Sequence, residues 1–224
     1  MRLQNRIGNR IWKHTLEKSI DVAIKLISSA SDDNLIRLTY ALERLAPSST
    51  DAYSVRVVRD AFRSGHPSIV LAKKLGRGLS ENYRRGLATF LVRTLFYDSH
   101  TRISYEKEYG ISPPFTVLIS PTMRCNLSCD GCFAGEYSED DDLPADVMQR
   151  IIDESREIGI GLYTILGGEP LLYKPLFDII KQNPDSAFQI FTNATMVNER
   201  IVERLGELGN ATLVLSLEGL QQET

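Results

Sequence analysis

Residues 125–132 have the sequence Cys-Asn-Leu-Ser-Cys-Asp-Gly-Cys and contain all three cysteines of this 224-residue chain. Three scarce thiols in one short loop indicate a shared chemical task. The candidates for Cys125, Cys129 and Cys132 are an iron–sulfur site, a structural zinc site and disulfide chemistry. An odd number of cysteines fits a disulfide framework poorly. A structural zinc ion normally has four protein ligands, and none of the three histidines lies in the loop or after it.

An iron–sulfur site suits these three thiols better than the two alternatives. Soft thiolate ligands favour such clusters, and a four-iron cluster held by three cysteines keeps one iron without a protein ligand. A cofactor or substrate can occupy that position. The spacing of the cysteines therefore predicts a cluster that takes part in chemistry.

The composition excludes several other classes of protein. A hydrophobic content of 42% with 25% charged residues is ordinary for a soluble globular chain. The net charge of −3 does not favour nucleic-acid binding. No apolar run approaches the roughly 20 residues of a membrane span, and the N-terminus lacks the apolar core of a signal peptide. Cysteines kept as thiolates then indicate the reducing cytoplasm.

The first half of the chain has a helical pattern. Its first 15 or so residues are basic, which predicts either a solvated first helix or weak contact with a membrane surface or another partner. Apolar stripes at helical spacing follow, and Ser80 is a suitable N-cap. We expect an all-α region over residues 1–100 and a linker over 101–114. The stripes predict helices around residues 16–27, 35–45, 55–62, 69–75 and 80–95.

From residue 115 onward, predicted strands alternate with predicted helices. Short apolar runs rich in β-branched residues predict buried parallel strands, and the segments between them have helical spacing. Repeated strand–helix units imply an α/β fold with a parallel sheet and right-handed crossovers. The acidic run 139–142 is expected to be the solvated exit of the cysteine loop. The strands are predicted at residues 115–120, 160–166, 187–192 and 211–217.

Polar and glycine residues gather at the carboxyl ends of these strands, where parallel sheets and barrels form their active sites. The cysteines follow the first strand, and Gly167-Gly168-Glu169-Pro170 follows the second. Asn193 follows the third strand, and Ser216 and Glu218 end the fourth. Paired glycines allow the backbone to approach a ligand closely, and a carboxylate can accept hydrogen bonds from an ammonium group. A plain turn or a helix cap remains the alternative for each polar residue taken alone.

Taken together, the three-cysteine loop, Gly167-Gly168-Glu169-Pro170 and Ser216-Leu-Glu-Gly219 resemble the radical S-adenosylmethionine (SAM) superfamily over about residues 112–224. The resemblance implies a partial (β/α) barrel, a [4Fe–4S] cluster on the three cysteines and SAM bound at its fourth iron. It also implies that Gly167 to Glu169, with Pro170, hold the amino group of SAM. Asn193, Ser216 and Glu218 would bind its ribose or carboxylate. Phe133 would help to seat the adenine, although in the family the aromatic residue usually precedes the last cysteine, where this chain has Gly131.

The chemistry implied by the resemblance is reductive cleavage of SAM to a 5′-deoxyadenosyl radical, which abstracts hydrogen from a substrate that the sequence does not identify. An electron donor such as flavodoxin or ferredoxin is implied as well. The family barrel has six strand–helix units and four are predicted here, so we expect the chain to be part of a longer protein. A non-catalytic iron–sulfur sensor or scaffold and a structural zinc protein remain the alternatives.

Overall fold

The structure is a computed structural model that describes residues 31–46, 49–70, 78–132, 134, 138 and 141–217. The chain divides into two compact units, Met1–Phe96 and Tyr97–Thr224. The basic N-terminal stretch and the helix predicted around residues 16–27 lie outside the described residues, as does most of the helix predicted around 69–75.

Helices make up the described part of the first unit. Ser31 and Ser80 cap the first and last of these helices, because each hydroxyl oxygen accepts a backbone N–H bond, from Asn34 and Tyr83 respectively. Leu35 and Val55 are buried where the first two helices pack together. The result confirms the predicted helical N-terminal region. Its helices are α2 (Asp32–Leu45), α3 (Ser49–Arg63) and α5 (Glu81–Arg93), and a π-helical turn, η1 (Thr94–Asp98), follows α5.

The second unit opens with a helix, α6 (Ser99–Tyr109), most of which lies in the stretch 101–114 where a linker is predicted. Its sequence, SHTRISYEKEY, has no apolar stripe that periodicity could detect, and none of its residues is fully buried. Gly110 ends the helix in the left-handed conformation, with a φ of 70°. Gly159 lies against it so closely that a Cβ atom there would be 2.6 Å from the Asp98 carbonyl oxygen. The sequence pattern therefore did not predict this helix.

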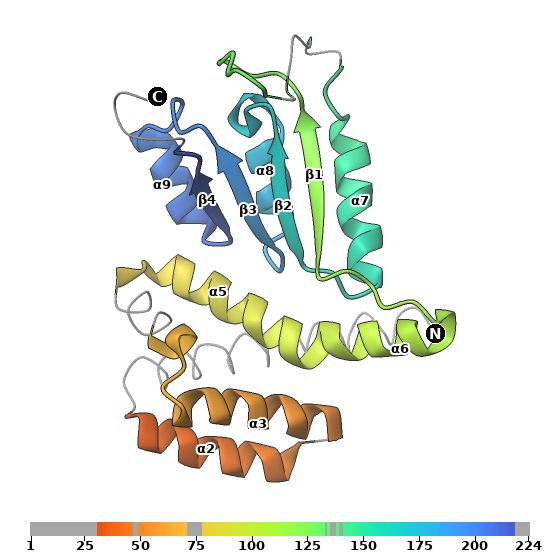
Figure 1. Cartoon of the computed structure of the whole chain (residues 1–224), viewed down its shortest axis with the longest axis vertical. Helices are drawn as coiled ribbons and strands as arrows, with labels where there is room; N and C mark the ends of the chain where they lie inside the picture. Colours follow the sequence, from red (N-terminus) through yellow and green to blue (C-terminus); the bar gives the residue numbers. More distant parts are fainter. Residues whose placement is uncertain are drawn as a thin grey trace. The chain divides into compact units, whose positions relative to one another are not determined.

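Four parallel strands in the order β1-β2-β3-β4 form the sheet of the second unit (Figure 1). Helices connect successive strands, so the predicted α/β class with parallel strands is confirmed. Among the described residues, β4 pairs with β3 alone. The strands are β1 (Thr116–Thr122), β2 (Leu162–Gly167), β3 (Ala187–Thr192) and β4 (Ala211–Leu215), and the connecting elements are α7 (Ala145–Glu157), η3 (Pro170–Leu172), α8 (Leu176–Gln182) and α9 (Glu199–Leu208).

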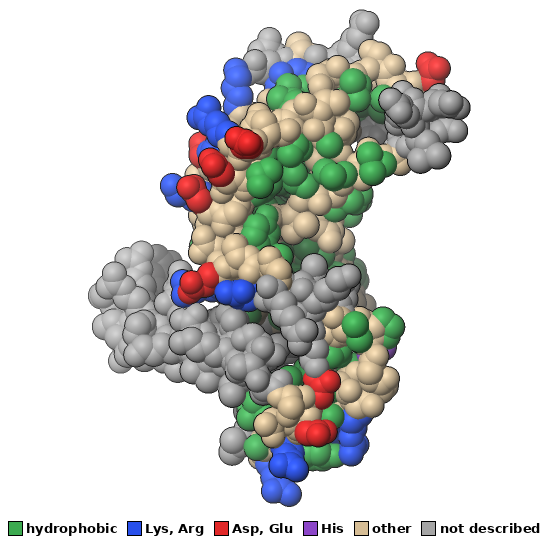
Figure 2. Space-filling view, turned by 90° about the vertical axis from the view of Figure 1, so that its left-hand side faces the viewer, with side chains coloured by type: hydrophobic (Ala, Val, Ile, Leu, Met, Phe, Trp, Pro, Cys, Tyr) green, Lys and Arg blue, Asp and Glu red, His purple; other side chains and the backbone are tan. Residues whose placement is uncertain are grey.

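The core of this unit lies between the sheet and its helices. The helix-facing side chains of β2 and β3 are fully buried, and the rings of Tyr163 and Phe188 stack with centroids 5.4 Å apart. The opposite face of the sheet is open among the described residues, where Leu118 is 62% exposed and Phe191 is 39% exposed. Figure 2 shows hydrophobic side chains gathered on the upper part of the molecule, seen from the side of β4 and α9. The described residues include no helix long and apolar enough to cross a membrane.

Tyr163 provides a stability test of this core. Its buried hydroxyl hydrogen-bonds the carbonyl oxygens of Ile152 and Ile160, at 3.0 and 3.1 Å. Burial raises the pKa of Tyr163 to about 12, from an ordinary value of 10. Burial disfavours ionisation of the Tyr163 hydroxyl in the folded state. The neutral side chain therefore contributes its full stabilisation of the fold below pH 10, and this contribution is lost as the pH rises toward 12.

We expect Tyr163→Phe to lower the free energy of unfolding by about 1–2 kcal/mol near neutral pH. The difference from wild type should shrink by about 1.4 kcal/mol between pH 8 and pH 11, because only the wild type loses the Tyr163 contribution. Urea unfolding of both proteins at the two pH values measures this convergence. A difference in unfolding free energy that stays constant between pH 8 and pH 11 would contradict the raised pKa of Tyr163.

Candidate functional site

The Gly167-Gly168-Glu169 turn at the end of β2 packs directly on the backbone that leads into the cysteine loop. Gly168 donates its N–H to the Thr122 carbonyl oxygen at 3.0 Å, and Glu169 donates its N–H to the Arg124 carbonyl oxygen at 2.7 Å. A Cβ atom would lie 2.2 Å from the Thr122 oxygen at Gly167 and 2.1 Å from the Arg124 oxygen at Gly168. The glycines are required by this approach of β1, whereas the sequence analysis assigned their close approach to a ligand.

Glu169 is a fully buried carboxylate held by neutral donors. Its Oε1 accepts the Leu171 N–H at 3.0 Å and the Thr192 hydroxyl at 2.8 Å, and its Oε2 accepts the Asn193 N–H at 2.9 Å. An ionised carboxylate has about four acceptor positions, and the described residues fill three of them. None of the ion pairs among the described residues includes Glu169. One of the four acceptor positions therefore has no donor among the described residues.

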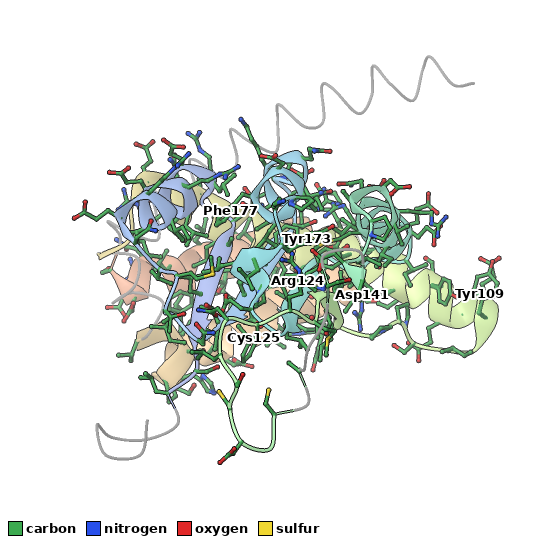
Figure 3. The ribbon with its side chains drawn as sticks, turned by 90° about the horizontal axis from the view of Figure 1, so that it is seen from above. Tyr109, Arg124, Cys125, Asp141, Tyr173 and Phe177 are labelled. Carbon is green, nitrogen blue, oxygen red and sulfur yellow. The ribbon has the colours of Figure 1, made fainter. Side chains whose placement is uncertain are left out.

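The cysteine loop leaves the carboxyl end of β1 next to this turn. Cys125 is half-buried, while Cys129 and Cys132 are exposed, and all three are free thiols. Cys132 donates its backbone N–H to the Cys129 carbonyl oxygen at 3.2 Å, and Gly131 between them has a φ of 74°. Figure 3 shows the loop that begins at Cys125 extending away from the strand ends. Within the described ranges, no three His, Cys, Asp or Glu side chains lie close enough together to hold a metal ion.

The two ends of the loop are joined by an ion pair between Arg124 and Asp142. Arg124 donates from Nε to Oδ1 at 3.1 Å and from Nη2 to Oδ2 at 2.6 Å. The guanidinium also donates to the Leu172 carbonyl oxygen at 3.3 Å, which ties both ends of the loop to η3. Burial acts to raise the pKa of Asp142, but hydrogen bonds from Arg124 and Thr122 outweigh burial and hold it below its ordinary value. Asp142 is thus an anchor, whereas the sequence analysis expected the whole acidic run to be solvated.

A double-mutant cycle on this pair should show strong coupling, because the Arg124 and Asp142 side chains are only 19% and 13% exposed. With Arg124→Met and Asp142→Asn we expect a coupling free energy of about 1–3 kcal/mol at neutral pH. The coupling should decline in acid, as Asp142 becomes protonated. The matched control is Arg204 with Asp178, which are 2.8 Å apart but 45% and 69% exposed. That surface pair should give about 0.2–1 kcal/mol. Urea unfolding measures both coupling energies. Equal values would contradict the role of the Arg124–Asp142 pair as an anchor of the cysteine loop.

Asn193, at the end of β3, connects Glu169 to the cysteine loop. Its backbone N–H binds Glu169, as given above, and its Nδ2 donates to the Asn126 Oδ1 at 3.0 Å and to the Cys125 Sγ at 3.7 Å. Asn126 in turn donates to the Thr195 hydroxyl at 2.7 Å. The loops that follow β1, β2 and β3 therefore share one hydrogen-bond network.

The remaining predicted site residues lie at or beyond the edge of this network. Pro170 is buried at the start of η3. Ser216 is exposed and donates its backbone N–H to the Thr192 carbonyl oxygen at 3.0 Å. Phe133 and Glu218 lie outside the described residues.

Four residues of this arrangement were not predicted as site residues from the sequence: Arg124, Asn126, Asp142 and Thr195. Proximity to the cysteines and to Asn193 was the only signal for three of them, and Asp142 had only its place in the acidic run.

Comparison with known families matches residues 119–224 to the Radical SAM superfamily. This segment is similar to the radical SAM superfamily. The matched segment begins within β1 and includes the cysteine loop, the Gly-Gly-Glu turn and Asn193. Members of this superfamily use a [4Fe–4S] cluster and SAM.

Several relatives of the radical SAM segment are enzymes. The AdoMet-dependent heme synthase of Methanosarcina barkeri is 33% identical over 107 residues, which are 46% of this chain and 31% of the relative. The probable GTP 3′,8-cyclase of Archaeoglobus fulgidus is 34% identical over 47% of this chain and 36% of the relative. The structure of Streptococcus suis SuiB bound to SAM aligns with a TM-score of 0.47 and 24% identity, over 78% of this chain and 42% of SuiB. The chain spans about a third of the length of the two sequence relatives.

The residues at the strand ends fit the cofactors of the superfamily. Three thiols on one loop match the soft ligands that iron–sulfur clusters prefer. Glu169 is buried and has an acceptor position left for a cationic donor, as an amino group would be. The donor set and the carboxylate come from neighbouring loops of one sheet edge.

Proposed function

We propose that this chain is part of an enzyme that binds a [4Fe–4S] cluster through Cys125, Cys129 and Cys132 and cleaves SAM reductively. The observation that carries the proposal is the hydrogen-bond network that joins Cys125 to the buried Glu169 through Asn193. A cluster-bound cofactor and an amino-group acceptor must be held at a fixed separation, and this network ties their protein ligands together.

The cluster would supply one electron to the sulfonium of SAM, which breaks the C5′–sulfur bond into methionine and a 5′-deoxyadenosyl radical. The residues of this chain bind and orient the reactants. Glu169 would accept the amino group of SAM, in a position fixed by its bonds to Leu171, Thr192 and Asn193. The Gly167-Gly168 turn would keep that carboxylate beside the base of the cysteine loop. Phe133, Pro170, Ser216 and Glu218 are proposed as further SAM contacts on the strength of their place in the sequence.

The electron donor is proposed to be a small redox protein such as flavodoxin or ferredoxin. The substrate is a molecule from which the radical removes hydrogen. The named relatives include a heme synthase, a GTP cyclase and peptide cyclases, so their names span several substrate classes. We therefore propose the SAM chemistry without a substrate.

Anaerobic reconstitution with iron and sulfide, followed by dithionite and SAM, tests the proposal. We expect a brown protein with about four irons that forms 5′-deoxyadenosine, and we expect each Cys→Ala variant to lose both properties. Iron binding without binding or cleavage of SAM would instead support a non-catalytic iron–sulfur sensor or scaffold. A colourless protein that purifies with zinc would support a structural zinc site. Either of these results would overturn the enzyme assignment.

A further inference from the structure

The side-chain amide of Asn193 has all of its hydrogen-bonding positions occupied. Its Oδ1 accepts the Thr195 N–H at 3.0 Å and the Thr195 hydroxyl at 2.7 Å. Its Nδ2 donates to the Asn126 Oδ1 and to the Cys125 Sγ. An amide offers two lone pairs and two hydrogens, so no position is left for a ligand. Asn193 is therefore suited to act on the site through its neighbours.

The direction of every bond in this cluster is determined. Asn126 donates to the Thr195 hydroxyl, Thr195 donates to the Asn193 Oδ1, and Asn193 donates back to the Asn126 Oδ1. The three side chains thus form a closed cycle in which each member donates once and accepts once. A reversed Asn193 amide would set its NH₂ group against the Thr195 backbone N–H, which can only donate. The cycle consequently directs the remaining N–H of Asn193 to the sulfur of Cys125.

The backbone also holds Asn193 in this orientation. Ala194, the next residue, has a φ of 64°, which is uncommon for a residue with a side chain. This conformation costs about 1–2 kcal/mol and brings Thr195 back toward the Asn193 Oδ1. The Ala194 N–H also binds the Thr192 hydroxyl at 3.1 Å, and that hydroxyl donates to Glu169. The turn is therefore fixed by the same Thr192 hydroxyl that binds the buried carboxylate.

We propose that Asn193 is a positioning residue whose N–H···S bond to Cys125 raises the reduction potential of the cluster, with Asn126 and Thr195 fixing the orientation of its amide. The inference rests on the proposed function, since it requires Cys125 to be a cluster ligand. A hydrogen bond to a ligand sulfur stabilises the more negative, reduced form of a cluster. Removal of the donor should therefore make reduction harder.

The test is a redox titration of the reconstituted protein without SAM, in which electron paramagnetic resonance measures the amount of reduced cluster. Asn193→Ala should lower the ratio of reduced to oxidised cluster at a given potential by about three- to tenfold, and tenfold corresponds to about 59 mV for a one-electron couple. Thr195→Val should shift the ratio in the same direction by less, because it breaks the cycle without removing the donor. Thr195→Ser keeps the hydroxyl and should restore the wild-type value.

Asn198→Ser is the matched control. Asn198 lies in the same loop and caps α9 through its Oδ1, a role that a serine hydroxyl also fills without adding charge. It should titrate like the wild type. If clusters assemble but Asn193→Ala titrates like the wild type, the inference is overturned and the proposed function stands. If the wild-type protein assembles no cluster, the proposed function falls and this inference falls with it.

Discussion

Glu169→Gln is expected to weaken SAM binding by about ten- to a hundredfold, which corresponds to about 1.4–2.8 kcal/mol. The loss has two physical causes. The glutamine carries no charge to attract the amino group of SAM. Its NH₂ group must also face a donor, because the Leu171 N–H, the Thr192 hydroxyl and the Asn193 N–H all point at the carboxylate.

Titration calorimetry of the reconstituted protein with SAM measures the effect. Glu203→Gln is the matched control, because Glu203 is exposed on α9 and the same loss of charge there should leave the dissociation constant unchanged. The iron content of each variant separates a lost contact from a lost cluster. A Glu169→Gln protein with full iron content and wild-type affinity would show that this carboxylate does not hold the amino group.

The strands of the second unit were predictable because buried strands are short runs of apolar, often β-branched residues. The run Ala187–Thr192 was predicted with both of its boundaries, since polar residues flank an apolar core on either side. The fourth strand was predicted to residue 217 and ends at Leu215, where the structure has irregular backbone. Predicting that strand ends converge needed only the parallel order of the strands, and the bonds among Cys125, Glu169 and Asn193 show this for the loops after the first three strands.

Side-chain partners were not predictable, because they depend on contacts between distant segments. Arg124 and Asp142 are separated by the whole cysteine loop, and no periodicity reports that one neutralises the other. Helix α6 has no buried residue and so no apolar stripe to reveal it. Asn126 and Thr195 become meaningful only when two loops lie side by side. The sequence thus locates the strands, but it leaves open which donors meet at their ends.

Gly168→Ala should remove the cluster and lower the free energy of unfolding by about 2–4 kcal/mol. The added methyl group would lie 2.1 Å from the Arg124 carbonyl oxygen and 2.6 Å from that of Met123, and neither backbone atom can rotate away as a side chain can. To relieve the overlap, the turn must separate from β1, which breaks the Gly168 and Glu169 N–H bonds to Thr122 and Arg124. Because Cys125 follows Arg124 directly, the displacement passes into the cysteine loop.

Gly206→Ala is the control with the same chemical change. Gly206 lies inside α9, and a Cβ atom there meets nothing within 4 Å, so alanine should stabilise the helix by about 0.5–1 kcal/mol. The two substitutions should thus shift the urea midpoint in opposite directions, and only Gly168→Ala should lose iron on reconstitution. Full iron content in Gly168→Ala would mean that the cysteine loop is positioned independently of the turn after β2. The close approach of these two segments would then be a feature of the fold alone, with no part in holding the cluster.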